Sequence, residues 1–179
     1  MKTETRKDWI ILEPRDVDLS RSPLRSSFNE PTYVLGAFNP GFTRLPSGNP
    51  LMMVRIAEAL TEPLVGTSAR ALRWDAQFGY LTDEYPQDTV DASDPRKFQL
   101  LDHPSTVMAL TSLSWILPVE LSPEADRIEC IHYDKAIAPS VGYQEYGVED
   151  ARISLVDGVY YMTTCAVSSE RHSTVLYTS

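Results

Sequence analysis

The hydrophobic residues of this chain fall into short runs that are separated by proline and glycine. The runs are rich in Val, Ile, Leu and Tyr, and such runs between turn-forming residues are typical of β-strands. The clearest predicted strands cover residues 32–38, 51–57, 151–156 and 159–167, and weaker candidates cover 107–113 and 127–133. The pattern therefore predicts an all-β protein.

Two turns predict hairpins between these strands. Residues 45–50 read LPSGNP and place Gly48 and Asn49 where a turn needs positive φ. Asp157-Gly158 joins the runs 151–156 and 159–167 directly, which is a two-residue type I′ signal. Consecutive hairpins of this kind indicate a meander, and a sandwich, a barrel or a propeller would each contain one.

Residues 59–104 differ from the rest of the chain. They include the acidic, turn-rich run TDEYPQDTVDASDPRKF and show no sustained apolar period. We therefore expect a long loop or insertion here, within a single domain that covers residues 1–179. Val54, Ala57 and Leu60 have loose helical spacing, but Pro63 would stop a helix, and we prefer a strand.

Two segments of the chain share one layout. GAFNPGFTRLPSGNPLMMVRIAE begins at Gly36, and GVEDARISLVDGVYYMTTCAVSSE begins at Gly147. Each has a polar cluster, a strand, a Gly-containing turn, an apolar strand and a closing charged group. Successive blades of a propeller repeat in this way, although the similarity is one of pattern rather than identity.

The charge composition limits the kinds of molecule that the protein could bind. The formal net charge is −9 and the isoelectric point is about 4.8, which disfavours nucleic acid and anionic membranes. No apolar run approaches the ~20 residues of a membrane span, and the start MKTETRKDWIIL lacks a signal-peptide cleavage site. We expect a soluble, cytoplasmic protein with no nucleic-acid or membrane partner.

The spacing of cysteine and histidine excludes the common metal motifs. Cys130 and Cys165 form no C-x-x-C pair, and the three histidines have no i, i+4 spacing, so we expect no metal and reduced thiols. The motifs of serine hydrolases, nucleotide-binding loops and zinc proteases are also absent from the sequence.

Three polar clusters are candidates for chemistry. In the first, Asp150 and Arg152 share one face of a strand by alternation and are expected to pair, while Glu149 faces the other way. An ordinary ion pair at the end of a strand would look the same.

The second cluster combines Asn39, which can hydrogen-bond a polyol, with Arg55, which needs an anionic partner if it is buried. An exposed arginine on an alternating strand is the alternative. In the third, Arg171 and His172 could bind an oxyanion or a phosphate, or could belong to a plain polar loop.

Together these segments resemble glycoside hydrolase family 130, the β-mannoside phosphorylases and related β-mannosidases. The resemblance rests on GAFNPGF, LMMVRIAE, TSLS, YGVEDARIS and GVYYMTTCAVSSER, and VLGAFNPG with VRIAE is most similar to the β-1,2-mannoside branch. It runs from about Tyr33 to the C-terminus and is weakest through residues 59–104.

The resemblance implies a five-bladed β-propeller with the active site at one end of its channel. It also implies that Asp150 is the general acid and protonates the glycosidic oxygen through a substrate hydroxyl while phosphate inverts the anomeric carbon. By the same resemblance Asn39, Arg55 and Arg152 would contact the mannosyl unit or orient the acid. By the resemblance Arg171 and His172 would bind phosphate.

Three departures from the family pattern matter. Ala151 stands where the family usually has proline, and Trp115-Ile116-Leu117 replaces a His-Leu-Arg run that many β-1,2-mannoside members show. Five blades need ~200–225 residues, and the chain has 179. We therefore expect about the first half of the blades, an incomplete propeller whose open edges favour pairing with a second copy as a homo-oligomer.

The leading hypothesis is an inverting phosphorylase that cleaves β-mannosides, with β-1,2 linkage favoured, to mannose 1-phosphate. Its partners would be a β-mannooligosaccharide and inorganic phosphate as co-substrate, with no other cofactor. A β-mannoside hydrolase is one alternative, and a non-catalytic carbohydrate-binding remnant is another.

Overall fold

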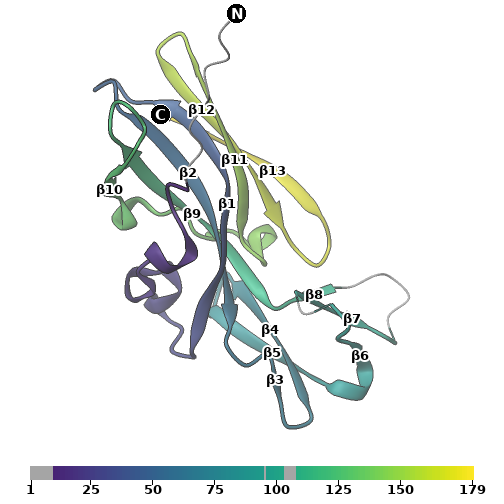
Figure 1. Ribbon diagram of the computed structural model, residues 1–179. Helices are drawn as coiled ribbons and strands as arrows, with labels where there is room; N and C mark the ends of the chain where they lie inside the picture. Colours follow the sequence, from purple (N-terminus) through teal and green to yellow (C-terminus); the bar gives the residue numbers. More distant parts are fainter. Residues whose placement is uncertain (1–9, 95, 103–107) are drawn as a thin grey trace, which may run out of the picture.

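The computed structural model describes residues 10–94, 96–102 and 108–179, and regular structure in those ranges consists of β-sheets and short 3-10 turns. The first sheet has the order β1-β2-β9-β10 and the second has the order β11-β12-β13, with neighbouring strands antiparallel. Figure 1 shows the two sheets side by side, with β11 next to β1. The first sheet contains β1 (Thr32–Arg44), β2 (Pro50–Leu60), β9 (Ser112–Leu121) and β10 (Ile128–Ile131), and the second contains β11 (Val148–Val156), β12 (Val159–Val167) and β13 (His172–Thr178).

The strong strand predictions are confirmed. β12 has the predicted bounds, and the other three predicted strands lie within β1, β2 and β11. The turn Asp157-Gly158 has φ values of 51° and 81°, as a type I′ turn requires. The weaker candidate 127–133 contains β10, and the candidate 107–113 is divided between β8 and β9, with Val107 outside the described residues.

Residues 59–104 were predicted to form a long loop or an insertion. Their described part is not a loop, and the insertion stays a prediction. After the end of β2, the described residues up to Leu110 form two small sheets, one of β3 (Leu64–Val65), β4 (Ser68–Asp75) and β5 (Gly79–Pro86), the other of β6 (Val90–Asp91), β7 (Lys97–Leu100) and β8 (Met108–Leu110). Residues 95, 103 and 104 lie outside the described ranges. These strands were missed because Ala69 and Ala71 hold two of the three buried positions of β4, and Leu72 is the single large apolar residue among the three.

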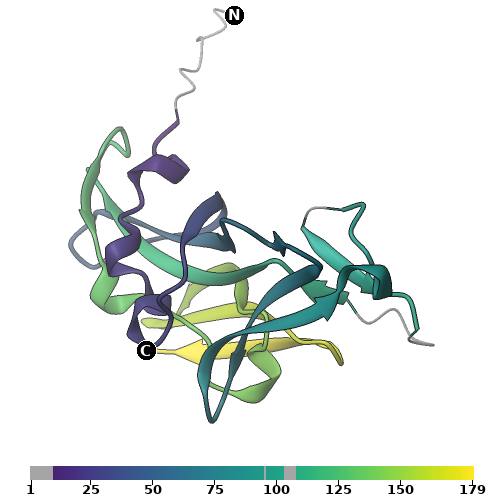
Figure 2. The same cartoon turned by 90° about the horizontal axis from the view of Figure 1, so that it is seen from below.

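The main hydrophobic core lies between the first sheet, the β3–β5 sheet and the N-terminal segment. Figure 2 shows this segment running across the first sheet, through the 3-10 turns η1 (Pro14–Asp16), η2 (Leu19–Arg21) and η3 (Pro23–Ser26). Leu24 and Phe28 from the segment join Ile56 and Trp115 of the sheet in this core. The N-terminal segment is thus part of the folded domain.

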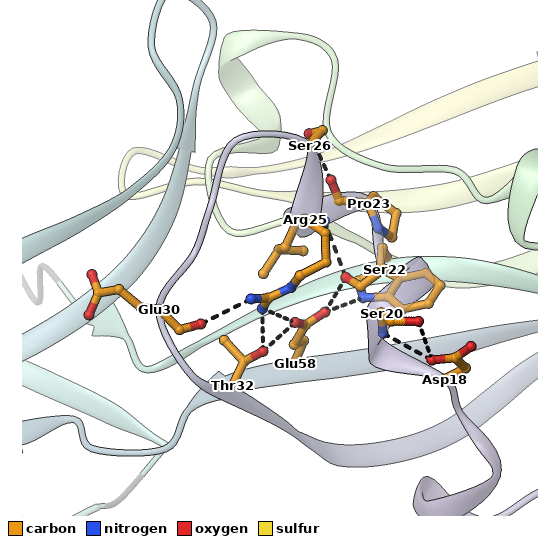
Figure 3. Close-up of polar contacts among 11 residues, drawn as sticks. Asp18, Ser20, Ser22, Pro23, Arg25, Ser26, Glu30, Thr32 and Glu58 are labelled. Atoms are coloured by element: carbon orange, nitrogen blue, oxygen red, sulfur yellow. Dashed lines mark hydrogen bonds and ion pairs between the residues drawn. The ribbon is translucent and has the colours of Figure 1, made fainter.

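A buried carboxylate fastens the N-terminal segment to β2. Glu58 is 0% exposed and accepts hydrogen bonds from the Ser22 and Thr32 hydroxyls, from Arg25 Nη2 at 2.9 Å and from Trp115 Nε1 at 3.2 Å. Figure 3 shows the Arg25 guanidinium between Glu58 and the backbone of Glu30. A buried charge is tolerated only with such partners.

The two larger sheets are joined through the residues before β11. The Ser114 amide donates to the Tyr146 carbonyl at 3.1 Å, and Ser114 forms an isolated bridge with Gly147. Gly147 has φ 114°, and a Cβ there would lie 2.2 Å from the Ser114 carbonyl oxygen. Only glycine fits this junction.

A second apolar cluster, which includes Met53, Ile116, Val148 and Met162, fills the space between the two larger sheets. The sheets do not close into a ring within the described ranges, so the count of five blades stays a prediction. No helix in the described ranges is both long and apolar enough to cross a membrane.

Candidate active site

Two matching bulges place Asn39 and Asp150 opposite each other. β1 gains one residue relative to β2 between Phe38 and Gly41, and β11 gains one relative to β12 between Glu149 and Arg152. Asn39 and Asp150 have left-handed backbones, with φ 48° and 51°. Asn39 Nδ2 donates to Asp150 Oδ1 at 3.1 Å. The two segments with the same sequence layout therefore each contain a bulge of one residue, and the two bulges meet where Asn39 contacts the Asp150 carboxylate.

Close packing of β1 against β11 positions these bulges. A Cβ at Gly41 would lie 2.7 Å from the Ala151 carbonyl oxygen, so a larger residue at position 41 would push the two strands apart. Strained backbones of this kind persist only where the surrounding structure holds them, and they are common at functional sites.

Arg55 on β2 connects the carboxylates of the site. Its side chain is 19% exposed, and it donates from Nη1 to Asp150 at 3.2 Å and from Nη2 to Glu149 at 2.5 Å. Its Nε donates to Ser114 Oγ at 3.1 Å, and its Cζ lies 4.9 Å from the centre of the Phe38 ring. These contacts fix the guanidinium in one orientation.

Glu149 is a site residue that the sequence analysis did not select. Its side chain is 14% exposed, and it accepts from Ser114 Oγ at 3.0 Å as well as from Arg55. Burial raises the pKa of Glu149, while Arg55 and the Ser114 hydrogen bond oppose this change. The site thus holds two adjacent carboxylates in different surroundings, because the side chain of Asp150 is 39% exposed.

The predicted pairing of Asp150 with Arg152 is wrong. No ion pair joins these residues in the described part of the chain, and Arg152 Nη1 instead donates to the Ala151 carbonyl at 2.7 Å. The extra residue of the bulge breaks the strict alternation that would have put both side chains on one face. Arg152 is exposed and contacts neither Asn39 nor Arg55 among the described hydrogen bonds.

A cavity of about 400 Å³, the first cavity, brings the third predicted cluster to the site. Arg171 and His172 line it together with Arg55 and Glu149. Both come from the end of the β12–β13 loop and the start of β13, and both are exposed. Asp150 and Asn39 do not line this cavity, but Arg55 both lines it and contacts Asp150.

The first cavity combines cations with hydrogen-bond donors suited to an oxyanion. Arg171 offers a planar guanidinium, and His172 offers ring nitrogens, one of which lies 4.0 Å from the Cys165 sulfur. Glu149 and Glu170 contribute negative charge to the same lining. Within the described ranges, no three His, Cys, Asp or Glu side chains gather as ligands of a metal would.

The fold and the site together define an all-β protein of antiparallel sheets with a carboxylate and arginine cluster where two sheets meet. The sequence matches no family model and no curated protein. Among solved structures, the chain is similar to the β-1,2-mannobiose phosphorylase from Listeria innocua, solved in complex with β-1,2-mannobiose. The two share 25% sequence identity with a TM-score of 0.74 over 93% of this chain.

This similarity supports a fold like that of glycoside hydrolase family 130, to which that phosphorylase belongs. The neighbour is a β-propeller-type enzyme, in agreement with the antiparallel sheets of this chain. The chain spans 45% of the length of the Listeria enzyme.

Proposed function

We propose that this protein is a β-mannoside phosphorylase that releases mannose 1-phosphate with inversion, with β-1,2-linked mannosides as the favoured substrates. The observation that carries the proposal is the contact of Asp150 with Asn39 and Arg55, beside a cavity lined by Arg171 and His172. The structural similarity to a β-1,2-mannobiose phosphorylase supports the same reaction class.

In this proposal Asp150 is the general acid. A phosphate oxygen forms a bond to the anomeric carbon, the bond from that carbon to the glycosidic oxygen breaks, and the leaving oxygen takes the electron pair. The proton of Asp150 reaches the leaving oxygen through a substrate hydroxyl. Asn39 and Arg55 hold the Asp150 carboxyl in position, since each places a donor within 3.2 Å of Oδ1.

Phosphate is assigned to the first cavity. Arg171 and His172 lie there with Arg55, and guanidinium groups match the oxygens of a phosphate. The local cations offset the net charge of −9, which would otherwise repel an anionic co-substrate. This assignment favours phosphorolysis over hydrolysis, because a hydrolase needs no anion site.

The test is the release of mannose 1-phosphate from β-1,2-mannobiose by the 179-residue chain, compared with Asp150→Asn and Glu149→Gln. The two variants are a matched pair, since each converts one of two adjacent carboxylates into its amide. We expect Asp150→Asn to lower the rate by about 10³-fold or more, and Glu149→Gln by about tenfold to 100-fold, because Glu149 acts through Arg55.

Each other outcome contradicts a named part of the proposal. Undiminished activity of Asp150→Asn with an inactive Glu149→Gln would transfer the role of acid to Glu149. Release of free mannose without phosphate would show a hydrolase. Binding of β-1,2-mannobiose without any turnover would show a non-catalytic sugar-binding protein.

A further inference from the structure

A second cavity, of about 370 Å³, lies beside the first cavity and has three lining residues in common with it. The two cavities share Arg55, Leu110 and Glu149 in their linings. Figure 1 shows the β6–β8 sheet below the loop that joins β12 to β13, and Leu110 is the last residue of β8. One wall of the second cavity comes from residues Asp94, Arg96 and Lys97, in the segment where the family resemblance is weakest.

The turn that carries this wall is held in place. The Arg96 carbonyl accepts from the Thr111 amide at 3.1 Å, which ties the turn to the residue between β8 and β9. Asp94 accepts from Arg96 Nε at 3.0 Å and from Nη2 at 2.9 Å, and the Lys97 amide donates to the Asp94 carbonyl at 3.2 Å. The charge of Arg96 is therefore neutralised within the turn.

Lys97 faces the cavity because its neighbour faces the opposite way. Phe98 is 2% exposed and packs with Ala69, Ala71 and Ala109 in the small core between the two small sheets. Strand alternation then directs the half-buried Lys97 side chain to the other face of β7, where it lines the cavity. No ion pair joins Lys97 to a carboxylate in the described part of the chain, so its ammonium group is available to a ligand.

The opposite wall of the second cavity is apolar. Leu35 and Phe38 are exposed by 39% and 37%, and Ala57 completes this side, whereas Leu110 pairs with Lys97 across β7 and β8. A wall of exposed carbons opposite hydrogen-bonding charged groups suits a sugar, which has C–H groups on its ring faces and hydroxyls at its edge. The first cavity differs because Arg171 and His172 make it suited to an anion.

We propose that the second cavity is a binding subsite for a neutral hexose unit, with Lys97 as a hydrogen-bond donor to its hydroxyls. This inference rests on the proposed function and deepens it. The sugar on the far side of the cleaved bond from phosphate occupies the second cavity, and phosphate occupies the first. Arg55 and Glu149, which line both cavities, lie between the two ligands.

The test measures binding of β-1,2-mannobiose and of inorganic phosphate separately, by titration calorimetry on the 179-residue chain. The variants are Lys97→Met, Arg171→Met and, as a control, Lys135→Met, whose exposed side chain lies outside both cavities. Methionine keeps most of the length of the side chain and removes its charge. We expect Lys97→Met to weaken mannobiose binding about tenfold and to leave phosphate binding within about twofold.

Arg171→Met should show the reverse pattern, and Lys135→Met should match the unaltered chain. Unchanged mannobiose binding by Lys97→Met overturns the subsite while leaving the proposed function intact. Loss of phosphate binding in Lys97→Met also overturns it, because the second cavity would then be the anion site. If the unaltered chain binds no mannobiose at all, the proposed function fails and the subsite fails with it.

Discussion

The buried carboxylate of Glu58 allows a prediction whose size follows from its contacts. Glu58→Gln keeps the shape of the side chain but replaces one carboxylate oxygen with an NH₂ group. Oε1 accepts from Arg25 and Thr32, and Oε2 accepts from Ser22 and Trp115. Whichever way the amide turns, its NH₂ group faces two former donors.

The hydroxyls of Ser22 and Thr32 can rotate to accept a hydrogen bond, but Arg25 and Trp115 have no acceptor atom. The less costly orientation turns the NH₂ group toward Trp115 and leaves its indole N–H buried without a partner, at about 1–3 kcal/mol. The ion pair with Arg25 is lost as well, and its effect is reduced because the Arg25 side chain is 27% exposed. We expect the free energy of unfolding to fall by about 2–4 kcal/mol.

Urea unfolding followed by tryptophan fluorescence measures this loss, because Trp115 is fully buried in the same core. Glu84→Gln is the matched control, since Glu84 has a 62% exposed side chain 3.5 Å from Arg70. For Glu84→Gln the free energy of unfolding should fall by only about 0–1 kcal/mol. A difference between the two variants below about 0.5 kcal/mol would refute the role given to the buried network.

Three further predictions concern the site and the junction between the sheets. Gly36→Ala would place a Cβ 2.1 Å from the Phe38 ring, which stacks on the Arg55 guanidinium. We expect the proposed phosphorolysis to fall about tenfold in turnover assays and the free energy of unfolding in urea to fall by about 1–2 kcal/mol. Gly147→Ala should lower the free energy of unfolding in urea by more than about 4 kcal/mol. Gly66→Ala is the control, because Gly66 has φ 59° but nothing within 4 Å of the new Cβ, and it should lower the same free energy by only about 1–2 kcal/mol. Equal losses in the two variants would contradict the steric argument. Because the folded state raises the pKa of Glu149 above 4.5, it binds the proton more tightly than the unfolded chain, and stability should decline as the pH rises from 4.5 through the folded value. Glu149→Gln should reduce this decline in thermal unfolding measured between pH ~4 and ~8, and an unchanged pH dependence would show that the carboxyl is not shifted.

The sequence predicted the strands that have large apolar residues and clear turns. The type I′ turn at Asp157-Gly158 sets both the position and the register of the hairpin around it, so β12 was found with its bounds. The strands between residues 64 and 100 were missed because a small sheet with one polar face needs few apolar residues. In β4, Ala69 and Ala71 hold two of the three buried positions beside Leu72, and alanine is no signal of a strand.

The site was predicted in part. Asn39, Arg55 and Asp150 are in contact, and Arg171 and His172 reach a cavity lined by Arg55. Arg152 was assigned the wrong partner, and Glu149 was placed on the face away from Asp150 although Arg55 contacts both, because the prediction assumed an unbroken alternation along β11. A bulge adds one residue without any apolar signal, and the matching bulge at Asn39 is likewise seen only in the structure.

The paired bulges give two copies of one backbone shape, one with an amide and one with an acid. A carboxylate in both copies would place two carboxyl groups in direct contact, since Asn39 Nδ2 lies 3.1 Å from Asp150 Oδ1. Such a pair would share one proton and titrate as a unit, as in the aspartic proteases. A single amide nitrogen, that of Asn39, therefore keeps the meeting of these two sheets from becoming an acid dyad.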